Sequence, residues 1–188
     1  AIQAGAAKNG QDATVTLVTF GGDVQTPHFC APSGALHPLS DYQYRPDGGT
    51  PLLDAVGRTI QRLQDRRDAA DAHVSFMFIV ITDGEENTSA MTARDVTALM
   101  AQVQKTDRWS FAFMLPPGMK SSFCARFGVP DGNVQEWEAT ERGMQDAGVA
   151  IMGGISSYYA TRSMGQTKTS GFFQTNVRDL SAREVRAK

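Results

Sequence analysis

The chain has 188 residues, of which 41% are hydrophobic, and this is enough to build the core of one domain. Its 18 basic and 20 acidic side chains give a net charge of -2, so no global field attracts nucleic acid or anionic lipid. No apolar run approaches the about 20 residues that span a bilayer, and no signal pattern opens the chain. We therefore expect a cytoplasmic protein with neither nucleic acid nor a membrane as a partner.

The chain opens with an alanine-rich stretch, AIQAGAAKNG, which is typical of the end of a helix closed by Asn9-Gly10. Because a helix end stands first, we expect the natural protein to extend upstream of Ala1. The only cysteines, Cys30 and Cys124, are far apart and belong to no metal-binding grouping. They are expected to be reduced thiols.

Two strand patterns follow the opening helix. ATVTLVTF (13–20) is rich in β-branched residues and ends at a Gly-Gly turn, which predicts a strand. DVQTPHFC (23–30) predicts a short edge strand, because Pro27 is tolerated at an edge and not in the centre of a sheet. Residues 31–49 have no sustained period and are expected to form a long loop.

The period becomes helical at GGTPLLDAVGRTIQRLQ, where apolar residues recur at the 3.6-residue spacing of an amphipathic helix. Its inward stripe is Leu52, Leu53, Val56, Ile60 and Leu63. Thr50 is placed to cap this helix, with Pro51 at the first helical position. The next segment, VSFMFIVI (74–81), is apolar without alternation, which is expected of a parallel strand covered on both faces.

Further helices and strands alternate after this strand. Residues 92–106 predict a helix with Val96, Leu99, Met100 and Val103 facing inward, and WSFAFML (109–115) predicts a strand. A short helix closed by Gly128 and a last strand at 133–139 complete the pattern. The repeated strand-helix order predicts an α/β fold with a doubly wound, mostly parallel sheet and helices on both of its faces.

A final helix is predicted to begin at Thr140, although Gly148, Gly153 and Gly154 each weaken it by about 1 kcal/mol relative to alanine. No clean period follows, and the adjacent Phe172 and Phe173 are its only obvious anchors. We therefore divide the chain into an α/β domain at 1–139 and a C-terminal helix and tail at 140–188.

Two polar features reach the edge formed by the carboxyl ends of the strands, where open parallel sheets bind ligands. Thr50 follows Gly48-Gly49, and Asp83 ends the strand within IVITDGEEN (79–87). A threonine hydroxyl bound directly and a carboxylate bound through water would suit a hard cation such as Mg²⁺. Taken singly, Thr50 also fits a plain helix cap and Asp83 a turn carboxylate.

Three blocks of the chain, ATVTLVTFGGDV, RPDGGTPLLDAVGRTI and FIVITDGEEN, together resemble the von Willebrand factor type A (vWA) domain in its bacterial intracellular branch. The resemblance covers about residues 1–139. It implies a Rossmann-like sheet with a metal-ion-dependent adhesion site at its top. It also implies that Thr50 binds Mg²⁺, Mn²⁺ or Ca²⁺ directly and that Asp83 binds the cation through water.

One family motif is missing, the Asp-x-Ser-x-Ser loop that follows the first and central strand of the vWA sheet. DLSAR (179–183) is a near miss, with Arg183 where the second serine should stand. We expect the central strand and its loop to precede Ala1, and the cation depends on that segment. The alternative is a degenerate, metal-free domain, although a sheet without its central strand exposes apolar faces and unpaired edges.

The sequence favours a binding module over an enzyme. It holds no phosphate-binding loop, GxGxxG, HExxH or GxSxG motif, and His28, His37 and His73 have no matching nucleophile. The resemblance implies a protein-protein interaction module in which a Glu or Asp of a partner completes the coordination of the cation. The alternative is a metal-free structural or assembly component, for example of a phage or other bacterial complex, that uses 140–188 as its contact surface. An enzyme using Asp83 for phosphate chemistry is the least favoured reading.

Overall fold

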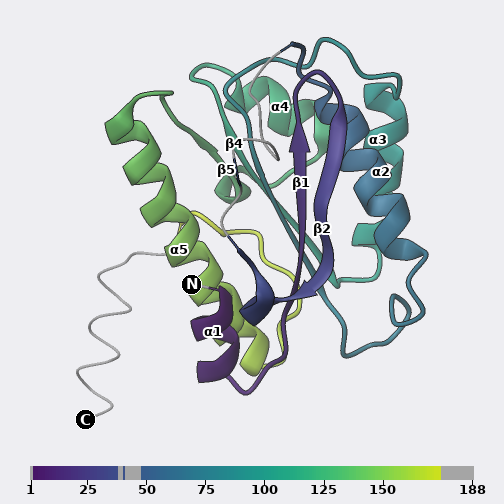
Figure 1. Ribbon diagram of the computed structural model, residues 1–188, viewed down its shortest axis with the longest axis vertical. Coiled ribbons are helices and arrows are strands. Elements are labelled where there is room, and N and C mark those ends of the chain that lie inside the picture. The colour runs from purple at the N-terminus through teal and green to yellow at the C-terminus, as the bar shows by residue number, and fades with distance from the viewer. Residues whose placement is uncertain (1, 38–39, 41–47, 175–188) are drawn as a thin grey trace.

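The computed structural model describes residues 2–37, 40 and 48–174. Its strands form two separate sheets (Figure 1). The first is the antiparallel hairpin of β1 (Thr14–Phe20) and β2 (Val24–Pro32), and the second is the parallel sheet of β3 (Phe76–Ile81), β4 (Trp109–Leu115) and β5 (Val134–Glu136). The helices are α1 (Ile2–Lys8), α2 (Leu52–Gln64), α3 (Ala93–Gln104), α4 (Lys120–Phe127) and α5 (Glu141–Ser163), with short 3₁₀ turns at Ser33–Ala35 and Asp131–Asn133.

The α/β class and the order of the elements are confirmed, and the architecture is compatible with a Rossmann-like fold. The opening helix ends where expected, with Gly10 in the left-handed region at a φ of 61°, and Gly128 closes α4 in the same conformation. The prediction of one continuous sheet is not met in the described residues, because β1 pairs only with β2 and β3 only with β4. Residues 38–39 and 41–47 of the predicted loop lie outside the described part.

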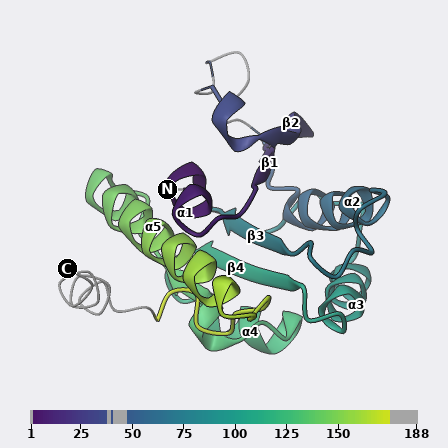
Figure 2. The same ribbon diagram turned by 90° about the horizontal axis from the view of Figure 1, so that it is seen from below.

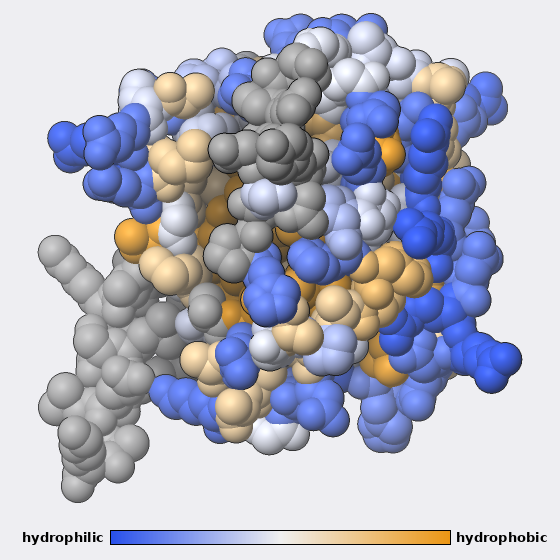
Figure 3. Space-filling view, viewed as in Figure 1, coloured by the Kyte–Doolittle hydropathy of each residue, from blue (hydrophilic) through white to orange (hydrophobic). Residues whose placement is uncertain are grey.

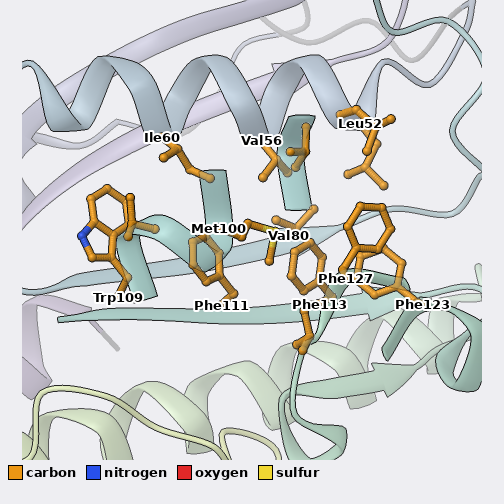
Figure 4. Packing of buried hydrophobic residues seen from close by; sticks show 14 of the residues in the cluster. Leu52, Val56, Ile60, Val80, Met100, Trp109, Phe111, Phe113, Phe123 and Phe127 are labelled. Carbon is orange, nitrogen blue, oxygen red and sulfur yellow. The ribbon is translucent and has the colours of Figure 1, made fainter. Parts of the chain in front are cut away.

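The larger hydrophobic core lies between the parallel sheet and helices α2, α3 and α4 (Figure 4). Ile60 of α2 and Met100 of α3 are fully buried, and Phe76 stacks on Trp109 with ring centroids 4.0 Å apart. Of the predicted inward residues of α3, only Leu99 is half-buried. The periodicity of the sequence therefore identified the inner faces of both helices.

The opposite face of the parallel sheet is covered by α1 and α5 (Figure 2). α5 begins within one residue of the predicted Thr140, which is its cap: the Thr140 hydroxyl accepts a hydrogen bond from Gly143 N at 3.0 Å. The chain after α5 then folds back, and Phe172 becomes fully buried against the Cα of Gly154, where a Cβ would overlap the ring. The anchoring role of Phe172 is thus confirmed, whereas residues 175–188, including DLSAR, lie outside the described part.

The prediction that β3 is covered on both faces is wrong for its last residue. Phe76 and Val80 are buried, but Ile81 is 45% exposed and the residues between are half-buried. The physical reason is that, within the part of the chain that the structure describes, β4 is the only strand paired with β3, so no strand covers the other edge of β3 there.

Both cysteines are free thiols and half-buried. Burial raises the pKa of the Cys124 thiol, which favours the protonated form. Among the helices that the structure describes, none is long and apolar enough to cross a membrane.

Candidate cation site at the strand ends

Thr50 and Asp83, predicted to lie at the same edge of the sheet, come from two loops that touch. A Cβ on Gly84, the residue after Asp83, would lie 2.9 Å from the Thr50 hydroxyl oxygen. The backbone N–H of Thr50 also donates to the side-chain oxygen of Asn87 at 2.8 Å. The absence of a side chain at position 84 therefore lets the two loops approach and brings the Thr50 hydroxyl beside the backbone that carries Asp83.

The prediction that Thr50 caps α2 is wrong. The helix begins at Leu52, Pro51 precedes it instead of occupying its first position, and no side chain of the residue before the helix caps it. Two groups from the loop after β3 take over this role. Leu53 N donates to the Glu86 carboxylate at 2.8 Å, and Asp54 N donates to the Ser89 hydroxyl at 3.0 Å.

A carboxylate is stabilised at the positive end of the helix dipole, so Glu86 is suited to the place at the start of α2 that was expected for Thr50. Because Glu86 and Ser89 bind the first amides of α2, the Thr50 side chain is not needed there, and it makes no hydrogen bond within the described part of the chain. Its oxygen is thus free to bind a ligand.

Glu86 holds the loop and the helix together. Besides Leu53 N, its carboxylate accepts hydrogen bonds from Thr88 N at 2.9 Å, from Ser89 N at 2.8 Å and from the Ser89 hydroxyl at 2.7 Å. Burial disfavours the charged form, but these hydrogen bonds outweigh it and lower the pKa of Glu86 below its usual value. Glu86 is therefore an ionised structural residue, with both of its oxygens already used.

Asp54 fixes the far end of the same loop. This carboxylate is 5% exposed, and it accepts hydrogen bonds from Met91 N at 2.8 Å and from the Arg58 guanidinium at 2.7 Å. Sequence reasoning missed both Asp54 and Glu86 as organising residues. No local pattern reveals them, since Glu86 and the helix N–H that it accepts lie 33 positions apart in the chain.

Asp83 differs from Glu86 because its side chain is exposed and makes no hydrogen bond or ion pair in the described residues. The backbone on either side of it is nevertheless held. Gly84 N donates to the Thr82 hydroxyl at 3.2 Å, and the indole N–H of Trp137 donates to the Thr82 carbonyl at 2.9 Å. The structure thus presents an exposed carboxylate, without a partner in the described residues, on a fixed turn whose next residue, Gly84, lies beside the Thr50 hydroxyl.

These two oxygen donors fit the chemistry of a hard divalent cation, which takes oxygen ligands and, as Mg²⁺, keeps several waters. They are not a complete site. No group of three or more His, Cys, Asp or Glu side chains able to hold a metal occurs among the described residues. Water and further oxygen ligands would have to fill the remaining positions.

A hollow of about 590 Å³ lies next to this edge, between β5 and the start of α5. Its walls include Glu136, Glu138, Arg142 and Asp146, together with Trp137. Glu136 is occupied in part by Lys120 N, which donates to it at 2.8 Å. The hollow is open to solvent. Trp137 forms part of its wall and also donates its indole N–H to Thr82, the residue before Asp83.

Comparisons with known proteins identify no relative that could assign a role to these residues. The resemblance to the vWA domain rests on the three sequence blocks alone. No family model, no curated protein and no solved structure matches this chain.

Proposed function

We propose that the chain is a cytoplasmic protein interaction module of vWA type that binds an acidic residue of a partner protein through a divalent cation, Mg²⁺ or alternatively Mn²⁺ or Ca²⁺. One observation carries the proposal. Thr50 lies against Gly84 with a free hydroxyl, because Glu86 performs the capping role that Thr50 would otherwise have. Asp83 offers a second free oxygen donor on the adjoining turn.

The bound cation would supply an open coordination position for a Glu or Asp carboxylate. Thr50 would bind the cation through its hydroxyl, and Asp83 would accept hydrogen bonds from waters on the cation. Such a contact between charges is directional, so it contributes specificity more than bulk affinity. The remaining ligands would come from an Asp-x-Ser-x-Ser segment, and high affinity is conditional on it.

Cation binding is tested by titrating the chain with Mn²⁺ and following the free ion by electron paramagnetic resonance. Thr50→Ala and Asp83→Ala are expected to weaken binding, whereas Glu85→Ala is expected to leave it unchanged. Glu85 is the matched control because it is an exposed carboxylate on the same loop. Equal binding by all three variants, with the fold intact by circular dichroism, would overturn the site.

Partner recognition needs a separate measurement. A short peptide with one glutamate should displace water from bound Mn²⁺ and lower the relaxation enhancement of the solvent protons. The same peptide with glutamine in place of glutamate should have no such effect, because the neutral amide is a weaker ligand for a hard cation. An equal response to both peptides would contradict recognition of an acidic residue.

The exposed face of α5 favours a second candidate, a metal-free assembly component. Met144, Val149 and Met152 are 60%, 51% and 50% exposed on this helix, and exposed apolar side chains close together on a surface are typical of protein contacts. Association that survives removal of divalent cations by EDTA and is lost in Met152→Asp would favour this candidate over the cation site.

A further inference from the structure

A hollow of about 180 Å³ lies between the β1–β2 hairpin and α2. This volume is that of about six water molecules in the liquid. β2 contributes Thr26 and Phe29 to its wall, and α2 contributes Arg58 and Arg62. On the face drawn in Figure 3, strongly hydrophilic surface and apolar surface lie side by side where the hairpin adjoins α2. The hollow therefore combines cationic groups with an apolar wall, and it is large enough for a small ligand group.

Arg62 is held against the hairpin by a ring contact. Its guanidinium carbon lies 4.1 Å from the centroid of the Phe29 ring, and Phe29 itself is 36% exposed. A guanidinium stacked on an aromatic ring is restrained in orientation, while its N–H groups stay available around its rim. These groups make no hydrogen bond or ion pair in the described residues. Arg62 is thus positioned by Phe29 with donors that the described part of the chain leaves unused.

The arginines four residues before and after Arg62 differ from it. Arg58 donates to the Asp54 carboxylate at 2.7 Å, and Arg66 donates to the Asp68 carboxylate at 2.7 Å. Arg62 stands between them with no carboxylate partner in the part of the chain that the structure describes. Because like charges one helical turn apart repel each other, an anion at Arg62 would relieve this repulsion.

Two other side chains add donors to the hollow. Thr26 is half-buried, and its hydroxyl has no hydrogen-bond partner among the described residues. Arg58 uses its Nη2 for Asp54, and its other N–H groups have no partner within those same residues. No carboxylate belongs to the described wall of the hollow. Arg62, Arg58 and Thr26 can therefore donate to different oxygens of one anion.

We propose that this hollow binds a phosphate monoester. The three terminal oxygens of such a group can accept from all three side chains at once, whereas a carboxylate has two oxygens. Phe29 would contact the carbon atoms next to the ester oxygen. The phosphate belongs to a small phosphorylated molecule or to a phosphorylated side chain of a partner protein. The hollow shares no residue with the pair Thr50 and Asp83, so the inference is independent of the cation.

The test titrates the chain of 188 residues in EDTA and follows it by proton–nitrogen NMR. The probes are inorganic phosphate, a short peptide with one phosphoserine, and the same peptide with glutamate at that position. The Nε–H signal of Arg62 and the backbone amides of Thr26 and Phe29 should shift with the two phosphates. Arg62→Gln should raise the dissociation constant about tenfold or more, because hydrogen bonds between charged groups are lost.

Three further variants separate a specific site from general attraction to positive charge. Arg67→Gln removes the same charge from an exposed arginine outside the hollow, and it should change the dissociation constant less than about twofold. Arg62→Lys keeps the charge but loses the planar fork and should weaken binding almost as much as Arg62→Gln. Thr26→Val keeps the shape of the side chain and should weaken binding about fivefold. Circular dichroism checks that each variant is folded.

The two phosphate probes distinguish the sources. Equal affinity for inorganic phosphate and the phosphoserine peptide would support a small phosphorylated ligand, and a peptide that binds at least about tenfold more tightly would support a phosphorylated partner protein.

Three outcomes would overturn the proposal. They are no signal shift at about 10 mM phosphate, glutamate peptide binding as tight as that of the phosphoserine peptide, and equal weakening by Arg62→Gln and Arg67→Gln. Because divalent cations are removed by EDTA, each result leaves the Mn²⁺ titration of Thr50 and Asp83 interpretable by itself.

Discussion

β4 and β3 are neighbours in one sheet, and both consist largely of apolar residues, yet their surroundings differ. All seven residues of β4 are buried, whereas β3 has two buried residues among six. β4 has a strand on each side and helices over both faces, while β3 has a strand on one side only among residues 2–37, 40 and 48–174. The burial of an apolar strand therefore depends on the number of its neighbours as much as on its composition.

The largest difference between the two strands is expected when matching phenylalanines are truncated. Phe111 of β4 and Phe78 of β3 are partners in register, and their ring centroids lie 5.2 Å apart. Phe111→Ala should lower the free energy of unfolding by about 3–5 kcal/mol, because a fully enclosed ring leaves a cavity. Phe78→Ala should cost about half as much, since its ring is half-buried. Urea denaturation measures both, and equal losses would contradict the contrast.

A second pair of variants compares a glycine of α5 that is packed against another side chain with one that is not. Gly154→Ala places a methyl group against the Phe172 ring and should destabilise the protein by about 1–3 kcal/mol. Gly148→Ala meets no atom within 4 Å and should stabilise the helix by up to about 1 kcal/mol. Thermal unfolding followed by circular dichroism gives both shifts. A stabilising Gly154→Ala would show that Phe172 does not pack there.

Glu86 joins the loop after β3 to the start of α2 through hydrogen bonds. Removing its carboxylate tests how much these polar contacts stabilise the fold beside β3. Glu86→Ala removes hydrogen bonds to a carboxylate and should lower the free energy of unfolding by about 1–2 kcal/mol, the small value reflecting its partial exposure to solvent. Because its folded pKa lies below the unfolded value near 4.5, this stability is present above that pH and is lost as the pH falls further.

The measurement for Glu86 is urea denaturation of wild type and variant at several pH values. The difference between the two proteins should be largest near neutral pH and should shrink as the pH falls below about 4.5. A difference that grows on acidification would mean that the Glu86 carboxylate is not the stabilising form.

The smallest effect is expected at the end of β3. Ile81→Thr replaces a side chain that is 45% exposed by another β-branched one, so the change in the free energy of unfolding should stay below about 1 kcal/mol. Urea denaturation is again the measurement. A loss of more than about 2 kcal/mol would show that the open edge of β3 is covered in solution, and would break the comparison with β4.

Much of the architecture was predictable because its signals are local. The apolar stripes of α2 and α3, the left-handed Gly128 and the cap at Thr140 each depend on residues within a few positions of one another. The role of Phe172 as an anchor was predictable, but its packing against Gly154 of α5 was not. Gly154, read from the sequence as a weakness of the helix, is the residue that admits the ring.

The candidate site shows where local reasoning stops. Thr50 was expected to cap α2, and a helix-start pattern beside it supported that interpretation. The cap in fact comes from Glu86 and Ser89, because the loop after β3 folds over the helix start and its carboxylate binds the N–H of Leu53. The pairing of Thr50 with Asp83 remains a prediction for cation binding, with their loops now in contact.

The sequence by itself determined the α/β class, the order and inner faces of the elements, and the placing of Thr50 and Asp83 at strand and helix ends. Periodicity and turn chemistry carry this information within short stretches. Only the tertiary structure decided which oxygens are occupied and which edges stay open. Those outcomes depend on contacts between residues distant in the chain, such as Leu53 with Glu86, and on the absence of a strand between β1 and β3 among the described residues.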